Sequence, residues 1–316
     1  MPTLKLGILL WSQAAGWPEM LDTARRIDRL GYDSIWTWDH LYAIFGDPYQ
    51  PIFEGWGVLH AWAMATERVK LGLMVGANTF RNPGLVAKQA ATLDHVSGGR
   101  AILGIGGAWM EGEHTAHGID YGTGPGQRLD WLDESVAAIR DLLDGRTVTS
   151  PEGGRYHFRE LRHAPLPVQA HLPILVGGTG RKKTLRTIAK YADVWNGFGT
   201  PEEAAELDGV LRAHCAAVGR DEREIERQIN LWLVIRDSEA EARRVWEAAA
   251  AHNRTPVEEM IEPSRPILGP VELVAERLRA YRDVGFGSVI VEVPAPYDVE
   301  TLERLVGEVK PLVDSA

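Results

Sequence analysis

Cysteine is almost absent from this sequence, since Cys215 is the one cysteine among 316 residues. A lone cysteine excludes an internal disulfide framework, and it fits a protein of the reducing cytoplasm. Residues 1–13 carry one cation and an apolar run too short for a secretory signal, with no small-residue cleavage site. We therefore expect a cytoplasmic protein without a signal peptide.

Long apolar runs and an excess of positive charge are missing as well. No apolar stretch approaches the ~20 residues that a membrane-spanning helix requires, so no membrane span is predicted. The 44 Asp and Glu outnumber the 34 Lys and Arg, and the net charge of −10 argues against nucleic acid as a main partner. An anionic small molecule in a local basic pocket stays compatible with this balance. Walker and nucleophile-elbow motifs do not occur either.

Apolar residues make up 45% of the sequence, and they form short strand patterns that alternate with helical patterns. We expect strands at residues 4–10, 34–37, 69–75, 101–105, 174–176, 193–196, 229–235 and 288–293. Eight strands that alternate with helices over ~300 residues predict an α/β fold, the (β/α)8 TIM barrel, with residues 1–316 as a single domain. The rival is a doubly wound open sheet with two domains, which no break in composition supports.

Helix-start signals and irregular regions complete this pattern. Thr200 and Glu203 form a capping box with proline at the first helical position. Two irregular regions are expected as insertions: a functional loop at 108–126, after strand four, and a segment with a small hairpin at 146–170, before strand five. A further loop is expected at 253–268.

The strand end at 174–186 is the most informative one, because TIM barrels build their sites at the carboxyl ends of the strands. Glycines at 177, 178 and 180 precede Arg181, Lys182 and Lys183, and a helical pattern follows. Cations at a helix start oppose the helix dipole unless an anion binds there, so we interpret the segment as a phosphate cradle. A tight turn with solvated Lys and Arg is the alternative.

Asp39 and His40 follow the second expected strand. An acid beside an imidazole at a strand end suits proton transfer, because histidine titrates near neutrality. A histidine fixed by hydrogen bonds in a loop is the alternative. Other residues at strand ends are Trp11, Asn196 and Glu292.

Gly104, Gly106 and Gly107 resemble half of a dinucleotide-binding fingerprint, but Trp109 occupies the place of the third glycine. A helix start and an acidic residue ~20 positions on are also missing, so a Rossmann site is rejected. These glycines instead give a flat ligand room to lie on the backbone.

Glu111, Glu113, His114 and His117 are potential metal ligands at helical spacing. Their order is not H-E-x-x-H, and no cysteine is nearby, so no metal site is predicted. A loop that contacts substrate or cofactor is the favoured interpretation.

Taken together, four segments resemble the luciferase-like (bacterial luciferase superfamily) oxidoreductases, and in particular their coenzyme F420-dependent branch. The segments are SIWTWDHL, VKLGLMVGANTFRNP, SGGRAILGIGGAWMEGEH and ILVGGTGRKKTLRTIAKYADVWN. The resemblance covers residues 5–235 and is weaker beyond them. It implies a TIM barrel that binds a flavin or deazaflavin at its carboxyl face, usually as a homodimer.

The resemblance also implies roles for single residues. Asp39 matches an aspartate that contacts the deazaflavin, and His40 matches a proton donor that we expect Asp39 to position. Met74-Val75 matches a non-prolyl cis peptide that bulges against the ring. Backbone near the ring and the phosphate-binding turn are matched by Gly106, Gly107, Ala108, Gly177, Gly178, Thr179, Gly180, Arg181 and Lys182.

One departure concerns the sugar-phosphate dehydrogenases of this branch, which carry a catalytic glutamate where this chain has Trp109. Glu111 or Glu113 could supply the acid instead. The basic residues that hold the substrate phosphate have no clear counterpart, so that substrate is not carried over. A tryptophan-rich rim at positions 11, 38, 109 and 195 suggests an apolar or planar substrate. The expected substrate contacts are Trp11, Trp109, Glu113 and His114.

The function expected from this resemblance is an F420-dependent oxidoreductase that transfers hydride between the deazaflavin C5 and a small-molecule substrate. An FMN-dependent monooxygenase that uses O2 is the first alternative, because both cofactors present a tricyclic ring and a phosphate. The anionic tail of F420 favours a basic exit path, which Arg181, Lys182, Lys183 and Arg186 could supply. A non-catalytic barrel that binds flavin or deazaflavin is the second alternative.

Overall fold

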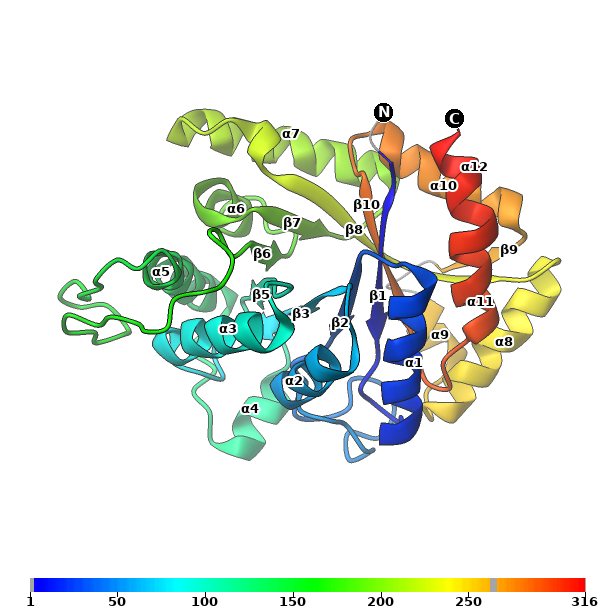
Figure 1. The fold of residues 1–316 in the computed structure, drawn as a ribbon, viewed down its shortest axis with the longest axis horizontal. Helices are drawn as coiled ribbons and strands as arrows, with labels where there is room; N and C mark the ends of the chain where they lie inside the picture. The colour runs from blue at the N-terminus through cyan, green and yellow to red at the C-terminus, as the bar shows by residue number, and fades with distance from the viewer. Residues whose placement is uncertain (1–2, 262–265, 316) are drawn as a thin grey trace.

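Parallel strands follow one another around a ring in a computed structural model that describes residues 3–261 and 266–315 (Figure 1). Hydrogen-bonded neighbours follow the order β3-β2-β1-β10-β8-β7-β6-β5-β4, and β9 pairs with β8 outside this path. The strand bounds are β1 Lys5–Leu10, β2 Ser34–Thr37, β3 Lys70–Leu73, β4 Gly76–Ala77, β5 Leu103–Gly106, β6 Ile174–Gly177, β7 Val194–Gly197, β8 Glu226–Ile235, β9 Ile267–Gly269 and β10 Ser288–Val293.

The ring closes beside β3. Leu71 in β3 forms a parallel bridge with Ala101, just before β5, through hydrogen bonds of 2.9 Å from the Leu71 N–H and 2.8 Å to the Leu71 carbonyl. β3 and β4 are two parts of one barrel position, separated by Met74 and Val75. The described strands therefore occupy eight barrel positions, and the expected (β/α)8 fold is confirmed.

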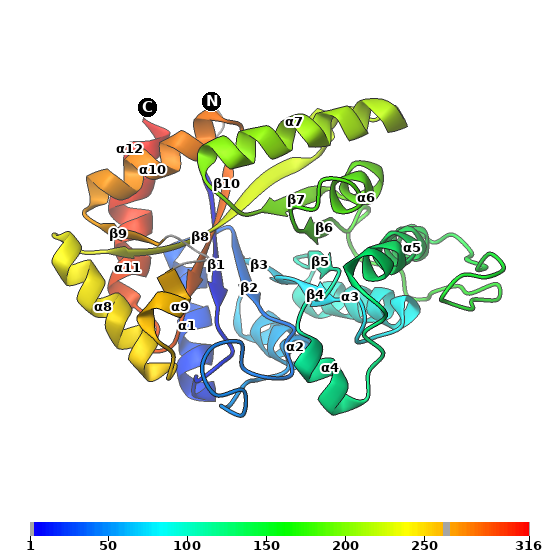
Figure 2. The same cartoon turned by 180° about the vertical axis from the view of Figure 1, so that it is seen from behind.

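Helices surround the ring of strands (Figures 1 and 2). Most of them connect one barrel strand to the next, as expected for right-handed β-α-β connections. Their bounds are α1 Trp17–Leu30, α2 Gly55–Ala65, α3 Pro83–Ser97, α4 Glu111–His117, α5 Pro125–Leu143, α6 Thr184–Tyr191, α7 Pro201–Val218, α8 Glu239–His252, α9 Val257–Ile261, α10 Val271–Asp283, α11 Val299–Arg304 and α12 Lys310–Asp314, with a 3-10 turn at Glu222–Glu224 and a π-helical turn at Leu305–Val309.

Local sequence signals explain several helix ends. The Thr200 hydroxyl accepts from the Glu203 N–H, and the Glu203 carboxylate accepts from the Thr200 N–H, which confirms the expected capping box of α7. α1 is followed by the C-cap Gly31, whose φ of 87° lies in the left-handed region that favours glycine.

The regions expected to be irregular contain more structure than the sequence indicated. The loop expected at 108–126 contains α4 and the start of α5, and the loop expected at 253–268 contains α9 and the start of β9. Residues 262–265 of that loop lie outside the described residues. In place of a regular hairpin, the 146–170 insertion has an antiparallel bridge between Val148 and Leu161. α4, α9 and β9 are too short for hydrophobic periodicity to identify them.

Apolar side chains fill both faces of the barrel wall, as buried parallel strands require. One hydrophobic cluster lies between strands and helices, and a second is rich in tryptophan and includes Trp11, Trp36 and Trp232. In the described part of the chain, no helix is both long and apolar enough to cross a membrane.

Candidate active site

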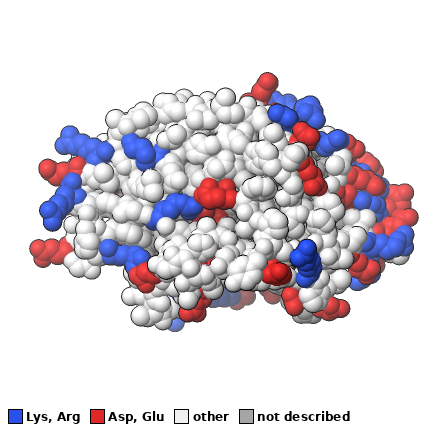
Figure 3. Space-filling view, turned by 90° about the horizontal axis from the view of Figure 1, so that it is seen from below, with Lys and Arg blue, Asp and Glu red and all other residues white. Residues whose placement is uncertain are grey.

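A cavity of about 1290 Å³ is lined by residues at the carboxyl ends of the barrel strands. Ligand sites commonly measure ~300–1,000 Å³, so this space has room for one large ligand or for two ligands side by side. Figure 3 shows the face toward which the β1 arrow of Figure 1 points. Many of its charged side chains lie toward the two ends, and the mostly uncharged area between them holds a few more, including an acidic group beside a basic one near the middle.

Most of the predicted site residues line this cavity. They are Asp39, His40, Met74, Val75, Gly106, Gly107, Ala108, Trp109, Glu113, Gly177, Gly178, Thr179 and Arg181. Four predicted residues, Trp11, His114, Gly180 and Lys182, are not part of the described wall. The structure therefore brings the strand-end residues together as expected, with corrections at individual positions.

His40 and Glu113 form a pair at the wall of the cavity. The Nδ1–H of His40 donates to Glu113 Oε1 over 3.0 Å, which leaves His40 Nε2 for a ligand. Glu113 Oε2 accepts from the backbone N–H of Leu41 at 2.8 Å and from that of Tyr42 at 3.4 Å. Burial raises the pKa of Glu113, but these hydrogen bonds and the His40 charge outweigh it, so the pKa lies below its ordinary value. Glu113 therefore fixes the imidazole and the loop that carries it.

Asp39 has a different partner from the one we expected. Its two carboxylate oxygens accept from Arg81 at 2.7 and 3.0 Å, and Oδ2 also accepts from the Ala77 N–H at 2.9 Å. Glu54 accepts a further hydrogen bond from Arg81. Burial raises the pKa of Asp39 above its ordinary value, against the effect of the Arg81 guanidinium. The expectation that Asp39 positions His40 was wrong, because the two adjacent side chains point to different partners.

The peptide bond between Met74 and Val75 is cis, as expected. The Val75 side chain then packs against two strand ends that carry glycine. A Cβ at Gly106 would lie 2.6 Å from Val75 Cγ2, and a Cβ at Gly177 would lie 3.0 Å from Val75 Cγ1. A side chain at position 106 would therefore displace Val75, and one at position 177 would crowd it.

The residues predicted to form a phosphate cradle lie in the turn between β6 and α6. The helix begins at Thr184, later than expected, so the three cations precede it. Arg181 forms a 2.7 Å ion pair with Glu206, and Lys183 forms one with Asp130 at 2.7 Å. These two cations have local carboxylate partners, and Lys182 is exposed.

Backbone N–H groups of this turn remain available to a ligand. Within the described part of the chain, the N–H groups of Thr179, Gly180 and Arg181 donate no hydrogen bond to another residue. The turn itself is held from behind, since Trp195 Nε1 donates to the Gly178 carbonyl at 2.9 Å. Such a turn at a helix start suits an anion.

Two residues expected at the substrate, Trp11 and His114, are structural instead, and so is Trp195 of the expected tryptophan rim. Trp11 is fully buried, and its Nε1 donates to Glu292 Oε2 at 3.0 Å. His114 is fully buried between the Thr79 hydroxyl at 2.6 Å and the Met110 carbonyl at 2.7 Å. Trp195 packs against Phe286 behind the β6–α6 turn. Only Trp38 and Trp109 of the expected tryptophan rim belong to the described cavity wall.

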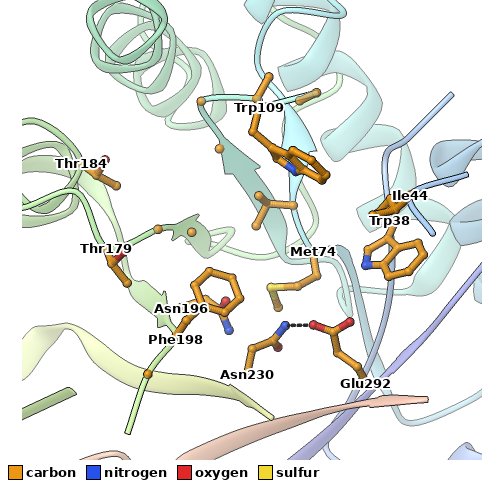
Figure 4. A pocket seen from close by; sticks show the side chains of 18 of the residues that line it. Trp38, Ile44, Met74, Trp109, Thr179, Thr184, Asn196, Phe198, Asn230 and Glu292 are labelled. Carbon is orange, nitrogen blue, oxygen red and sulfur yellow. Dashed lines mark hydrogen bonds between the residues drawn. The ribbon is translucent and has the colours of Figure 1, made fainter. Parts of the chain in front are cut away.

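The sequence interpretation missed other residues of the wall. Trp232 and Asn230 lie in β8, inside a stretch that we treated as apolar strand, and Phe198 follows β7 (Figure 4). Asn230 could have been found, because a polar residue in an otherwise buried strand usually has a partner. Arg81 gave no such signal, since nothing in the sequence links it to Asp39.

Several known proteins are similar to this chain in sequence. The sequence pattern of the family described as Luciferase-like monooxygenase matches residues 5–288. An F420-dependent glucose-6-phosphate dehydrogenase from Kineococcus radiotolerans is 30% identical, and the match covers 98% of this chain and 97% of that enzyme. An uncharacterized protein from Mycobacterium tuberculosis is 34% identical over 175 residues. That match covers 55% of this chain and 60% of the relative, less than two thirds of its length.

Solved structures extend the likeness to the fold. An F420-dependent secondary alcohol dehydrogenase, in complex with an F420-acetone adduct, superposes with a TM-score of 0.83. The two chains are 19% identical, and the superposition covers 99% of each. At this level of identity the comparison supports the barrel architecture alone.

Proposed function

The chain belongs to the luciferase-like monooxygenase family, and from this membership we propose that it is a coenzyme F420-dependent oxidoreductase. It transfers hydride between the deazaflavin C5 and a small organic substrate. The single observation that carries the proposal is the placement of His40, with Nε2 free of Glu113, in the same cavity as the glycine-lined Val75 bulge.

The residues present fit a flat cofactor. Val75 stands against Gly106 and Gly177, where a Cβ would displace or crowd it, and both glycines line the cavity. Gly107 and Ala108 continue this backbone surface. We assign these residues to the ring, which needs a smooth surface without side chains. The N–H groups at 179–181 are assigned to the cofactor phosphate, where Arg181 adds positive charge.

His40 is assigned to proton transfer. When bound, the deazaflavin accepts or donates hydride. The reaction at an alcohol or carbonyl then needs one proton to leave or reach the substrate oxygen. Nδ1–H of His40 is held by the Glu113 carboxylate, so Nε2 faces the reaction as acceptor in the neutral form and as donor in the imidazolium form. Glu113 fixes this tautomer and orientation.

Two alternative functions are an FMN-dependent monooxygenase and a non-catalytic binding barrel. The family description names monooxygenases, and an FMN-dependent enzyme that uses O2 could occupy the same cavity. The preference for F420 rests on the relative that matches nearly the whole chain and on the basic residues near the phosphate turn. A non-catalytic binding barrel is disfavoured by the His40–Glu113 pair, because a passive ring site has no need for an oriented imidazole.

The deciding experiment is calorimetric titration of the purified protein with F420 and, separately, with FMN. We expect binding of F420 and weak or no binding of FMN. Tight FMN binding without F420 binding would overturn the proposal. Size-exclusion chromatography coupled to light scattering, with the same preparation, tests whether the protein is a homodimer, as we also propose. Cell fractionation tests its cytoplasmic location.

A further inference from the structure

Glu292 is a buried carboxyl group of the cavity wall that the proposed reaction does not use. It lies in β10, where Oε2 accepts from Trp11 Nε1 at 3.0 Å and Oε1 accepts from Asn230 Nδ2 at 2.6 Å. Figure 4 shows Asn230 and Glu292 pointing toward one another at the cavity. Among the described residues, no Lys, Arg or His forms an ion pair with Glu292. When Glu292 is ionised, its negative charge is therefore stabilised by neutral hydrogen-bond donors alone.

Aromatic side chains surround this part of the cavity. Trp11 packs against Trp38, Phe45 and Trp232 with ring centroids 4.6, 4.7 and 5.5 Å away. Trp38, Phe45 and Trp232 line the cavity and form an aromatic wall, and the buried Trp11, which donates to Glu292, packs behind them. Such a wall suits an apolar or planar group and favours a cation over an anion at the faces of its rings.

The charges along the cavity wall point the same way. Arg181 is the one Lys or Arg among the described lining residues, and it is paired with Glu206. The acidic lining residues are Asp39, Glu113, Glu203, Glu206, Glu259 and Glu292. Once Glu292 is ionised, a substrate phosphate or carboxylate placed near it would meet a carboxylate without a cationic partner, together with aromatic rings. Burial of two negative charges close together lowers the affinity for an anionic ligand.

We propose that Glu292 and the aromatic wall form the substrate subsite, which takes an apolar group that carries a hydrogen-bond donor. The donor is a hydroxyl or an ammonium group, and anionic substrates are rejected. This inference rests on the proposed function, because it names the substrate class of the same cavity. The Glu292 carboxylate accepts from the donor, and Trp38, Phe45 and Trp232 cover the apolar part.

A titration of Glu292 accompanies this subsite. Burial raises the pKa of Glu292 to about 7, against the hydrogen bonds from Trp232, Trp11 and Asn230. A donor ligand prefers the ionised carboxylate, so its binding strengthens as the pH rises through about 7. An anionic ligand gains nothing from this ionisation and is repelled by it.

The test uses benzyl alcohol, benzylamine and benzoate as matched probes, titrated against the F420-loaded protein by calorimetry, with tryptophan fluorescence as a second readout. We expect the two donor probes to bind at least tenfold more tightly than benzoate at pH 8. The Glu292→Gln variant should reduce the preference for benzylamine over benzoate by tenfold or more, because the amide carries no charge and can donate to benzoate. The control, Glu226→Gln, changes the same residue type at the first residue of β8, the strand that pairs with β10, and should keep the wild-type preference.

Three results would overturn the subsite. The first is benzoate binding as tight as that of the donor probes. The second is a preference for benzylamine over benzoate that stays unchanged in Glu292→Gln. The third is a loss of F420 affinity in that variant, which would make Glu292 a cofactor contact. Should the variant fail to fold, the pH dependence of benzylamine binding to the wild type decides, and a flat profile from pH 6 to 8 rejects the subsite. Failure of F420 to bind rejects the proposed function. It does not decide the subsite, because the preference among the three probes can also be measured in the protein without F420.

Discussion

Glu113 Oε1 lies 3.0 Å from His40 Nδ1, and 73 positions separate the two residues in the chain. α4 is responsible for this pairing, since it turns Glu113 inward while Glu111 on the same helix stays exposed. Trp109 occupies the position where the sugar-phosphate dehydrogenases that the sequence resembles carry an acid. Glu113 meets the histidine from one helical turn further along. Of Glu111 and Glu113, the two residues that the sequence offered for this acid, the structure places Glu113 beside His40.

Replacement of Glu113 by glutamine tests this pair. The amide keeps the size of the side chain but loses the charge that holds the Nδ1–H tautomer of His40. We expect turnover to fall roughly ten- to a hundredfold, with F420 affinity unchanged within about twofold. Steady-state kinetics at several pH values and fluorescence titration of F420 measure the two effects. A shift in the pH profile would identify a change at the imidazole rather than a general loss of structure.

The matched control is Glu111→Gln, which makes the same change on the exposed side of α4. This variant should keep wild-type turnover. Equal losses in the two variants would show that α4 as a whole, and not the carboxylate beside His40, supports activity. Loss of F420 affinity in Glu113→Gln alone would also contradict the assigned role.

The buried pair of Asp39 and Arg81 predicts a stability effect. Asp39→Asn leaves the Arg81 guanidinium partly buried with the more exposed Glu54 as its remaining carboxylate partner. Removal of one member of a buried pair costs on the order of 3 kcal/mol in the free energy of unfolding. Urea unfolding measures this loss. Asp22→Asn, which breaks an exposed pair with Arg25, should cost less than about 1 kcal/mol, and equal losses would argue against a special role for Asp39.

Much of the barrel could be predicted from the sequence, because strands buried on both faces appear as short apolar runs separated by helical patterns. The same map places Asp39, His40 and the glycine turns at one end of the barrel. The pairings within that end could not be predicted. α4 is too short for periodicity to show which face turns inward, and the partner of Asp39 depends on how the segment after β4 crosses the barrel mouth. Trp11 shows a second limit of the sequence prediction, since a residue expected at a strand end can point into the core and not into the cavity.

The phosphate turn predicts a loss of cofactor affinity on removal of its cations. Arg181→Ala combined with Lys182→Ala should weaken F420 binding several-fold, and Arg181→Ala alone should account for most of the loss because only Arg181 lines the cavity. The wild type should also lose affinity with added salt more steeply than the double variant, since screening weakens exposed charges. Arg223→Ala, at an exposed pair with Asp221, is the control. Unchanged affinity in the double variant would reject the cradle.

The raised pKa of Glu292 predicts how stability changes with pH. Its pKa is about 7 in the folded protein, against an ordinary value of 4.5. Between these values the folded state binds more protons than the unfolded state, so Glu292 lowers stability as the pH rises. Relative to the wild type, Glu292→Gln should therefore gain on the order of 3 kcal/mol between pH 4.5 and pH 8. Urea unfolding at several pH values tests this, and a constant difference would contradict a raised pKa.

The contact between Gly106 and Val75 gives the sharpest test of the ring surface. In Gly106→Ala the new Cβ would stand 2.6 Å from Val75 Cγ2, so Val75 must shift into the cavity or the strand must move. We expect F420 affinity to fall by about tenfold or more and stability to drop by about 1–3 kcal/mol from overpacking. Gly209→Ala is the control, because it lies within α7 with nothing within 4 Å of the added Cβ. That helical substitution should stabilise the protein by about 0.5–1 kcal/mol and leave F420 binding unchanged. Wild-type affinity in Gly106→Ala would mean that the bound ring does not depend on the position of Val75.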